Sequence, residues 1–243
     1  MVQLERLTIG FHSPASRPPP SMTRPPSRRA TLPSLRFFDF HGATEYLEEF
    51  VARIDLNALC KVSLRLFNDI FFDIPHISQF ISRINALGSP TGVYVTLSVE
   101  FVSVVFFSDR GQSNENCFLG TSCRRLDWQL SFATEISSQF SALLSSVHEL
   151  IIQAPKMPTG EGDSTQWLEF FQSFTHVTEV TVWDEKLVPG IVQALVMEDV
   201  AAGVLPELTR LYLEDGRSPS TVKAAEQFVA TRRLSGCTVY LSG

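Results

Sequence analysis

The sequence lacks any long hydrophobic run. Its longest apolar stretch, Phe101 to Phe107, is interrupted by Ser103 and is far shorter than the roughly 18 residues that suggest a membrane-spanning helix. The first ten residues contain Glu5 and Arg6 and no apolar centre of the kind a secretory signal needs. We therefore expect a soluble protein of the cytoplasm or the nucleus, without membrane contact.

Cysteine is scarce and shows no metal-binding spacing. The chain has 4 cysteines; Cys117 and Cys123 are the closest two, and no histidine lies near them. Isolated cysteines outside a secreted context are usually free thiols. The sequence predicts reduced thiols in the core and no bound metal.

Basic residues are fewer than acidic ones. The 243 residues include 20 Lys and Arg against 26 Asp and Glu, giving a net charge of −6 and a pI near 5.4. General nucleic-acid binding needs a basic footprint, so we expect none. Tryptophan and tyrosine are few (3 and 4) whereas there are 19 phenylalanines, which points to a large apolar core because phenylalanine has no polar group.

Catalytic motifs are missing or incomplete. Gly120 to Arg124 begins like a nucleophile elbow but lacks its closing glycine. Gly160 to Thr165 is glycine-rich but lacks the lysine of a phosphate-binding loop. His176 and Glu179 could share one face, a pairing that is more often solvated polar surface than a catalytic or metal site. We expect no enzyme activity and no cofactor.

The chain has a recurring hydrophobic pattern, called the apolar phrase below. In each copy three apolar residues occur, the second three positions after the first and the third two positions after the second. First members lie 28, 27, 88, 30 and 31 residues apart, and the gap of 88 could hold two degenerate copies. A period of this size is typical of stacked supersecondary units. The copies are Leu4-Leu7-Ile9, Leu32-Leu35-Phe37, Leu59-Val62-Leu64, Val147-Leu150-Ile152, Val177-Val180-Val182 and Leu208-Leu211-Leu213.

Helix-like segments alternate with these strand-like phrases. We expect helices at about 45–55, 75–87, 132–146, 164–175, 186–203 and 219–233, and a strand-like stretch from Val93 to Phe107. Asp163 and Gln166 form a capping-box pattern. One strand and one helix per unit predict a parallel sheet. The predicted fold is α/β: an irregular leucine-rich-repeat-like solenoid over residues 1–243, with the sheet on one face and helices on the other. A doubly wound domain shows the same alternation.

Residues 12–31 break the pattern. They are rich in proline and arginine, so we expect a disordered loop. Arg28-Arg29-Ala30-Thr31 matches a basophilic kinase pattern, which makes Thr31 a candidate phosphosite. Arg17 to Pro20 could offer a polyproline face to a partner.

Several stretches carry a resemblance to a known family. They are Cys123–Gln129, Leu143–Leu150, Thr165–Glu169, Leu205–Glu214, Gln227–Gly236 and Ile74–Ile81. Together they resemble the C-terminal leucine-rich-repeat-like region of F-box proteins from mushroom-type (basidiomycete) fungi. The resemblance implies a module that recruits substrates to an SCF-type ubiquitin ligase. No F-box helix precedes the first phrase, which suggests a truncated product and makes contact with the ligase adaptor doubtful.

A protein partner would meet the side chains that alternate with the apolar phrase. These run from basic in the early units to acidic and then aromatic in the later ones. The candidates are Arg6, Arg36, Lys61, Arg65, Glu149, Glu179, Trp183, Arg210 and Tyr212. On this reading the protein is a monomeric binding module. The alternative is a small-molecule enzyme on a doubly wound domain, with polar groups near Asp109 or Asp184.

Overall fold

The elements form a mixed α/β structure. The computed structural model describes residues 4–12, 29–56, 58–67, 74–84, 89–108, 115–156, 163–196, 204–213, 219–234 and 240–242. In chain order they are β1 (Arg6–Gly10), β2 (Ala30–Thr31), β3 (Phe37–Gly42), α1 (Thr44–Val51), β4 (Ile54–Asp55), β5 (Lys61–Leu66), α2 (Pro75–Ser82), β6 (Gly92–Ser98), β7 (Val102–Phe107), β8 (Glu115–Thr121), α3 (Leu126–Gln139), α4 (Ser141–Leu144), β9 (Glu149–Lys156), α5 (Ser164–Gln172), β10 (Glu179–Trp183), α6 (Val188–Val196), β11 (Arg210–Leu213), α7 (Pro219–Leu234) and β12 (Tyr240–Ser242).

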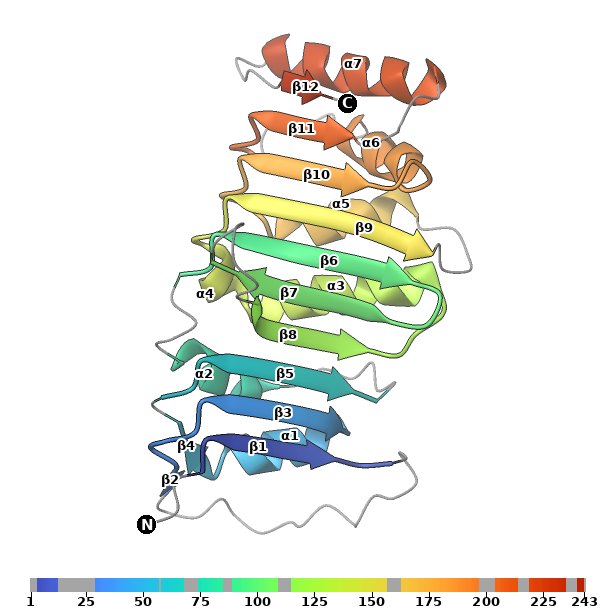
Figure 1. Ribbon diagram of the computed structural model, residues 1–243. Helices are drawn as coiled ribbons and strands as arrows, with labels where there is room; N and C mark the ends of the chain where they lie inside the picture. Colours follow the sequence, from blue (N-terminus) through green and yellow to red (C-terminus); the bar gives the residue numbers. More distant parts are fainter. Residues whose placement is uncertain are drawn as a thin grey trace.

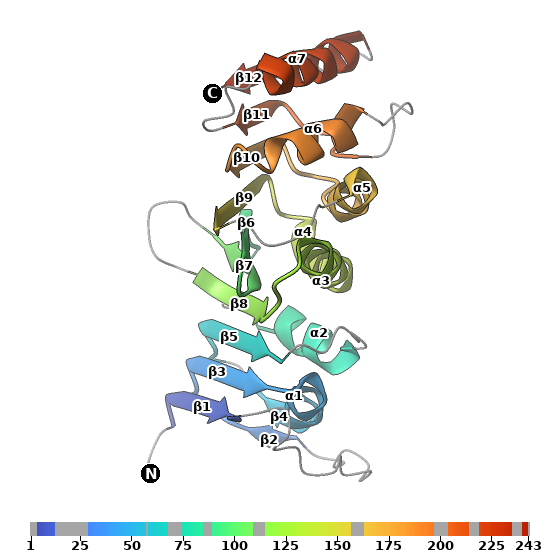
Figure 2. The same ribbon diagram turned by 90° about the vertical axis from the view of Figure 1, so that its right-hand side faces the viewer.

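One long sheet dominates the molecule (Figure 1). Its strand order is β1-β3-β5-β8-β7-β6-β9-β10-β11-β12, and every neighbouring pair is parallel except the two that involve β7. The helices of the described residues lie along one face of this sheet (Figure 2). A doubly wound domain would carry helices on both faces, so the predicted alternative does not match this arrangement.

Five of the six predicted apolar phrases end in strands of this sheet (β1, β5, β9, β10 and β11), and these strands and β3 all run in the same direction. Their inward side chains line up across it in two buried rows. The first row contains Leu7, Phe38, Val62, Cys117, Phe106, Val93, Leu150, Val180 and Leu211. The second contains Ile9, Phe40, Leu64, Leu119, Val104, Val95, Ile152, Val182 and Leu213.

The second phrase was predicted three residues too early. The copy that faces the core is Leu35-Phe38-Phe40, because Phe38 pairs with Leu7 and Val62. Phe37, which the sequence had suggested as a core residue, is 37% exposed. Leucine and phenylalanine are so frequent here that both registers fit the same pattern, and only strand pairing distinguishes them.

The middle of the chain does not hold two further strand–helix units, as the spacing had predicted. β6, β7 and β8 form an antiparallel meander instead, with a short turn at 99–101 between β6 and β7. Antiparallel neighbours need no crossover helix, so three strands fit where two repeats were expected. The two apolar rows still pass through all three strands without a break.

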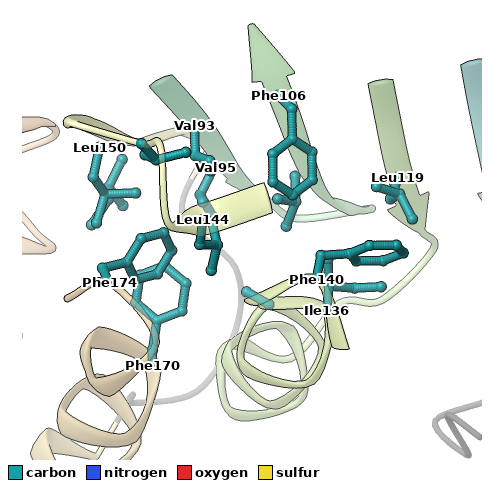
Figure 3. Close-up of a cluster of buried hydrophobic side chains, with 14 of the residues drawn as sticks. Val93, Val95, Phe106, Leu119, Ile136, Phe140, Leu144, Leu150, Phe170 and Phe174 are labelled. Carbon is teal, nitrogen blue, oxygen red and sulfur yellow. The ribbon is translucent and has the colours of Figure 1, made fainter. Parts of the chain in front are cut away.

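Helices α3 and α5 cover the centre of the sheet (Figure 3). Ile136 and Phe140 lie beneath Phe106 and Leu119, while Phe170 and Phe174 point toward Leu150. Phe170 and Phe174 are fully buried, and their ring centroids are 4.9 Å apart. These contacts explain much of the phenylalanine excess.

Helix α3 starts at Leu126, earlier than the predicted 132. It carries Gln129, which is completely buried. The Gln129 amide donates to the backbone carbonyls of Ser98 (2.5 Å) and Cys123 (2.6 Å). Ser98 is the last residue of β6, and Cys123 follows the end of β8. The hydrogen bonds therefore tie α3 to the strands that it covers, a role no sequence pattern had indicated.

The predicted capping box at α5 is confirmed. Asp163 accepts a hydrogen bond from the Thr165 amide (3.2 Å), and Gln166 accepts one from the Asp163 amide (3.3 Å). Such reciprocal bonds satisfy backbone donors that the first helical turn leaves open.

The strands begin with one recurring hydrogen-bond arrangement. The amides of Arg36 and Phe37 both donate to the carbonyl of Glu5, at 2.8 and 3.1 Å. β5, β9, β10 and β11 begin in the same way, through the carbonyls of Arg36, Thr91, His148 and Thr178. Strands at both ends of the sheet are thus joined to their neighbours by equivalent contacts.

The prediction that the thiols lie in the core is right for one of the three described cysteines. Cys117 is buried, Cys123 is partly buried and Cys60 is exposed. Burial raises the pKa of the Cys117 thiol to about 12. Cys60 lies outside the apolar rows, just before β5 begins.

Several predictions concern residues that the structure does not describe. These are the proline- and arginine-rich residues 13–28, the loop glycines Gly160 and Gly162, and Asp109 and Cys237. Among the helices that are described, none combines the length and hydrophobicity needed to cross a membrane.

Candidate protein-binding surface

The candidate surface is the outer face, defined as the sheet face turned away from the helices (Figure 2). Because side chains alternate along each strand, its residues form columns across the sheet. The middle column contains Thr8, Asp39, Ser63, Phe118, Val105, Tyr94, Ile151, Thr181 and Tyr212. A column at the amino ends of the strands and one at their carboxyl ends flank it.

The predicted basic residues gather at the β1 end of the outer face, with one exception. Arg6 lies over the ring of Phe37 at 5.0 Å, and Arg65 lies over the ring of Phe118 at 5.8 Å. Lys61 follows in the same column as Arg6 and Phe37. Arg36 does not belong to the columns, because β3 begins at Phe37 and Asp39 takes the outward position between the two inward apolar residues that the predicted phrase gave to Arg36. Arg36 is an exposed residue at the entrance to β3.

The predicted acidic residues lie next to each other. Glu149 and Glu179 are register partners on β9 and β10. The Glu179 carboxylate is largely buried and contacts the Arg210 guanidinium at 2.7 Å. His176 contacts the Glu207 carboxylate at 3.2 Å. This part of the outer face is a mixed polar surface with its charges paired.

An aromatic patch lies between these charged ends. Val105 and Ile151 form its floor; they are 7% exposed but do not belong to the apolar core cluster on the helix side. Tyr94, Phe107, Phe118 and Trp183 surround them. Tyr94, Phe107 and Phe118 are half-buried and Trp183 is exposed; aromatic side chains of this kind are enriched at protein interfaces.

Tyr94 and Trp183 meet across an intervening strand. They belong to β6 and β10, yet their ring centroids are 5.5 Å apart in an edge-to-face arrangement. The two rings thus reach toward each other over β9 and shield Ile151. Burial raises the pKa of the Tyr94 phenol to about 12, so the hydroxyl stays neutral at physiological pH. Trp183 is 42% exposed.

The rings of Phe107 and Phe118 lie against glycines of the sheet. The Phe107 ring occupies the space in which a Cβ on Gly92 would lie, and the Phe118 ring approaches the Cβ position of Gly120 to 3.0 Å. Both glycines are on the outer face. Because these glycines have no side chain, the two half-buried rings can lie close to the backbone.

The sequence predicted Trp183 and Tyr212 but missed Tyr94, Val105, Phe107 and Phe118. All four belong to the meander, where the period had suggested ordinary repeats. Alternation within β7 could have revealed Val105 and Phe107, because they alternate with the inward Val104 and Phe106. The predicted trend from basic to acidic holds, but the aromatics cluster in the centre rather than at the end.

The remaining candidates lie apart from this surface. Thr31 is exposed in β2 and pairs with Asp55 of β4. Arg29 of the same kinase-like pattern contacts the Asp55 carboxylate at 3.2 Å. Asp184, considered for an enzyme, accepts a hydrogen bond from the Lys186 amide at 2.8 Å.

No metal site is apparent in the part of the chain that the structure describes, where no three His, Cys, Asp or Glu side chains come together suitably. Comparisons with protein-family models, with curated proteins and with solved structures each gave no match. The function is therefore inferred from the surface itself.

Proposed function

We propose that the chain is a non-catalytic protein-interaction module that binds its partner on the outer face. The aromatic patch carries this proposal. It combines a packed apolar floor with tyrosine and tryptophan rings, and the described helices lie on the opposite face. Aromatic residues contribute disproportionately to interface energy. An intracellular, monomeric protein without a cofactor fits this role.

The proposed architecture is an irregular leucine-rich-repeat-like solenoid. Three features support it: the single sheet, the helices along one of its faces, and the equivalent strand entrances at both ends. Stacked units of this kind form long open surfaces suited to protein binding. The meander would then be an irregularity within the stack.

The resemblance to fungal F-box proteins suggests which partner to look for. In that case the outer face would hold a substrate of an SCF-type ubiquitin ligase. The resemblance also implies a ligase adaptor, and its recovery is scored separately from that of the substrate.

The experiment is affinity purification with quantitative mass spectrometry, using the wild type and the double variant Trp183→Ala, Tyr212→Ala. Trp183 belongs to the aromatic patch, and Tyr212 lies in the middle column of the outer face on β11. Removing two interface aromatics typically costs more than about 2 kcal/mol, so partner recovery should fall at least tenfold. The control is Trp128→Ala: Trp128 is 48% exposed but lies at the start of α3, away from the patch.

Circular dichroism should show that all three proteins are folded. A protein partner recovered equally with the double variant and the wild type would contradict binding at this face. Loss of that partner with Trp128→Ala alone would move the binding site to the helix side.

A further inference from the structure

One cation borders the aromatic patch on the outer face. Arg65 of β5 is exposed, and its guanidinium lies over the ring of Phe118 on β8, 5.8 Å from the ring centroid. The neighbours of Arg65 in the carboxyl-end column are His41 and Gly120. A guanidinium held against an aromatic ring keeps its planar donor edge and loses less freedom when it binds a carboxylate.

The charge of Arg65 is not used inside the protein. The ion pairs within the described part of the chain do not include Arg65, whose guanidinium contacts an aromatic ring instead. By contrast, Arg210 in the amino-end column contacts the Glu179 carboxylate at 2.7 Å. A carboxylate from outside can therefore bind Arg65 without breaking an internal ion pair.

The carboxylates of the outer face are poorly placed to receive Arg65 from a second copy of the chain. Those described in the three columns are Asp39, Glu149 and Glu179, and none of them is exposed. Two copies that met symmetrically through their outer faces would bring the same patch of each together. Arg65 would then meet no exposed carboxylate among these residues. The charge at this place favours a different, acidic partner.

The aromatic surface extends from Phe118 toward the exposed ring of Trp183. Phe118, Val105 and Tyr94 are successive members of the middle column, on β8, β7 and β6 (Figure 1). Neighbouring strands lie about 4.8 Å apart, so Phe118 and Tyr94 are separated by about 10 Å. Tyr94 in turn contacts Trp183, with 5.5 Å between the ring centroids. One short segment can therefore reach both the guanidinium and the Tyr94–Trp183 pair.

We propose that the outer face binds a partner segment that presents an acidic side chain and an apolar side chain about 10 Å apart. The carboxylate accepts two hydrogen bonds from the Arg65 guanidinium, and the apolar side chain lies on the rings of Tyr94 and Trp183. In an extended segment, residues two or four positions apart share one face at about 7 or 13 Å, which brackets this distance. This inference rests on the proposed function, because it names the chemistry of the partner that the outer face binds.

The probe is a phage-displayed library of random twelve-residue peptides, selected on the immobilised whole chain. Peptides retained by the wild type should combine an Asp or Glu with a Leu, Ile, Phe or Trp, because both parts of the site are then used. The peptide recovered most often is synthesised with a fluorescent label, and its affinity is measured by anisotropy. A consensus without an acidic residue, or no enrichment over an uncoated surface, would overturn the proposal.

The decisive variants change Arg65. Arg65→Glu should lower the affinity for this peptide at least tenfold and Arg65→Gln at least threefold, because the carboxylate then meets a like charge or no charge. A peptide with Lys in place of its acidic residue should bind Arg65→Glu more tightly than it binds the wild type. Lys223→Glu reverses the same charge at an exposed position of α7, away from the outer face, and should leave the affinity within twofold. Circular dichroism checks that each variant is folded.

Equal affinity of the acidic peptide for the wild type and a folded Arg65→Glu protein would sink the proposal. The double variant Trp183→Ala, Tyr212→Ala separates that result from a failure of the proposed function. Weak binding to the double variant with unchanged binding to Arg65→Glu would refute only the acidic partner, whereas unchanged binding to the double variant would contradict binding at this face. Sedimentation velocity gives the remaining outcome: a dimer of the wild type that Arg65→Glu dissolves would mean that a second copy occupies the face instead.

Discussion

At the scale of single residues, Tyr94 shows how the outer face differs from an ordinary solvated sheet surface. Its neighbours in the middle column are Val105 and Ile151, and its ring touches that of Trp183. These apolar surroundings disfavour the phenolate, which is why the pKa rises from 10.0 to about 12. The same desolvation would help an apolar partner to bind.

The raised pKa of Tyr94 predicts that the stability of the fold depends on pH. Between about pH 10 and pH 12 the unfolded chain releases the Tyr94 proton while the folded chain retains it, so the free energy of unfolding falls as pH rises through this range. Below pH 10 this contribution is constant. Between pH 8 and pH 11 the free energy of unfolding, measured with urea, should fall less for Tyr94→Phe than for wild type. Equal losses would mean that the Tyr94 hydroxyl is not desolvated.

At the scale of elements, the helices differ in how their starts are stabilised. α5 carries its own capping box. α2 begins after Ile74, which cannot cap, and takes its cap from α1: the Glu48 carboxylate accepts hydrogen bonds from the amides of His76 (3.0 Å) and Ile77 (2.7 Å). A carboxylate at a helix start also interacts favourably with the helix dipole. Glu48 thereby joins two neighbouring helices.

Replacing Glu48 should destabilise the protein without affecting the outer face. Glu48→Ala removes both cap bonds, and lost caps typically cost about 1–2 kcal/mol. We expect a drop of that size in the free energy of unfolding, measured with urea. Glu169→Gln, an exposed carboxylate on α5, is the matched control and should change stability by less than about 0.5 kcal/mol. A drop as small as the control's would show that α2 does not need this cap.

These two helices illustrate what could be predicted from the sequence. The α5 cap was predictable because its residues are three apart; the α2 cap was not, because Glu48 and His76 meet only after folding. Strand positions near the ends of the sheet followed from the apolar phrase. The meander did not, since a continuous apolar run such as that of β7 fits either neighbour direction.

The candidate surface also contains residues that could be predicted from the sequence and contacts that could not. Arg6, Arg65 and Trp183 could be predicted, because alternation fixes which side chains face outward once a strand is recognised. The Tyr94–Trp183 contact could not, since it spans β9 and depends on the strand order. The position of Arg36 failed because the second phrase was predicted three residues too early; β3 begins at Phe37, so Arg36 lies just before the strand.

At the scale of the whole molecule, the helix layer divides into two groups. α1 packs on α2, while α3, α5, α6 and α7 pack in succession. Across the boundary, β5 pairs with β8 in the sheet, and the Ser78 hydroxyl donates to the Gln139 carbonyl at 2.9 Å. Neighbouring elements therefore stabilise one another locally, and the two groups meet mainly through the sheet.

This arrangement predicts that destabilisation stays local. Phe38 is buried and contacts the rings of Phe50 and Phe80, with centroids 5.5 and 6.2 Å away. Phe38→Leu should speed amide hydrogen exchange in β1, β3 and β5, while β10 and β11 stay protected, because exchange reports cooperative local units. Val182→Ala in β10 should instead speed amide hydrogen exchange in β10 and β11, while β1, β3 and β5 stay protected. A uniform increase across all strands would indicate a single cooperative unit.

The reversed order of the meander also has a consequence for the newly made chain on the ribosome. β5 ends at Leu66, but its next neighbour β8 is Glu115–Thr121. Synthesis proceeds from the N-terminus at about 5–20 residues per second. For several seconds, until Thr121 has left the exit tunnel, β1, β3 and β5 therefore exist without β8, and the edge of β5 that pairs with β8 has no partner strand. We therefore expect assembly of the sheet in this region to lag behind translation, with the β5 edge exposed to wrong pairing during this interval.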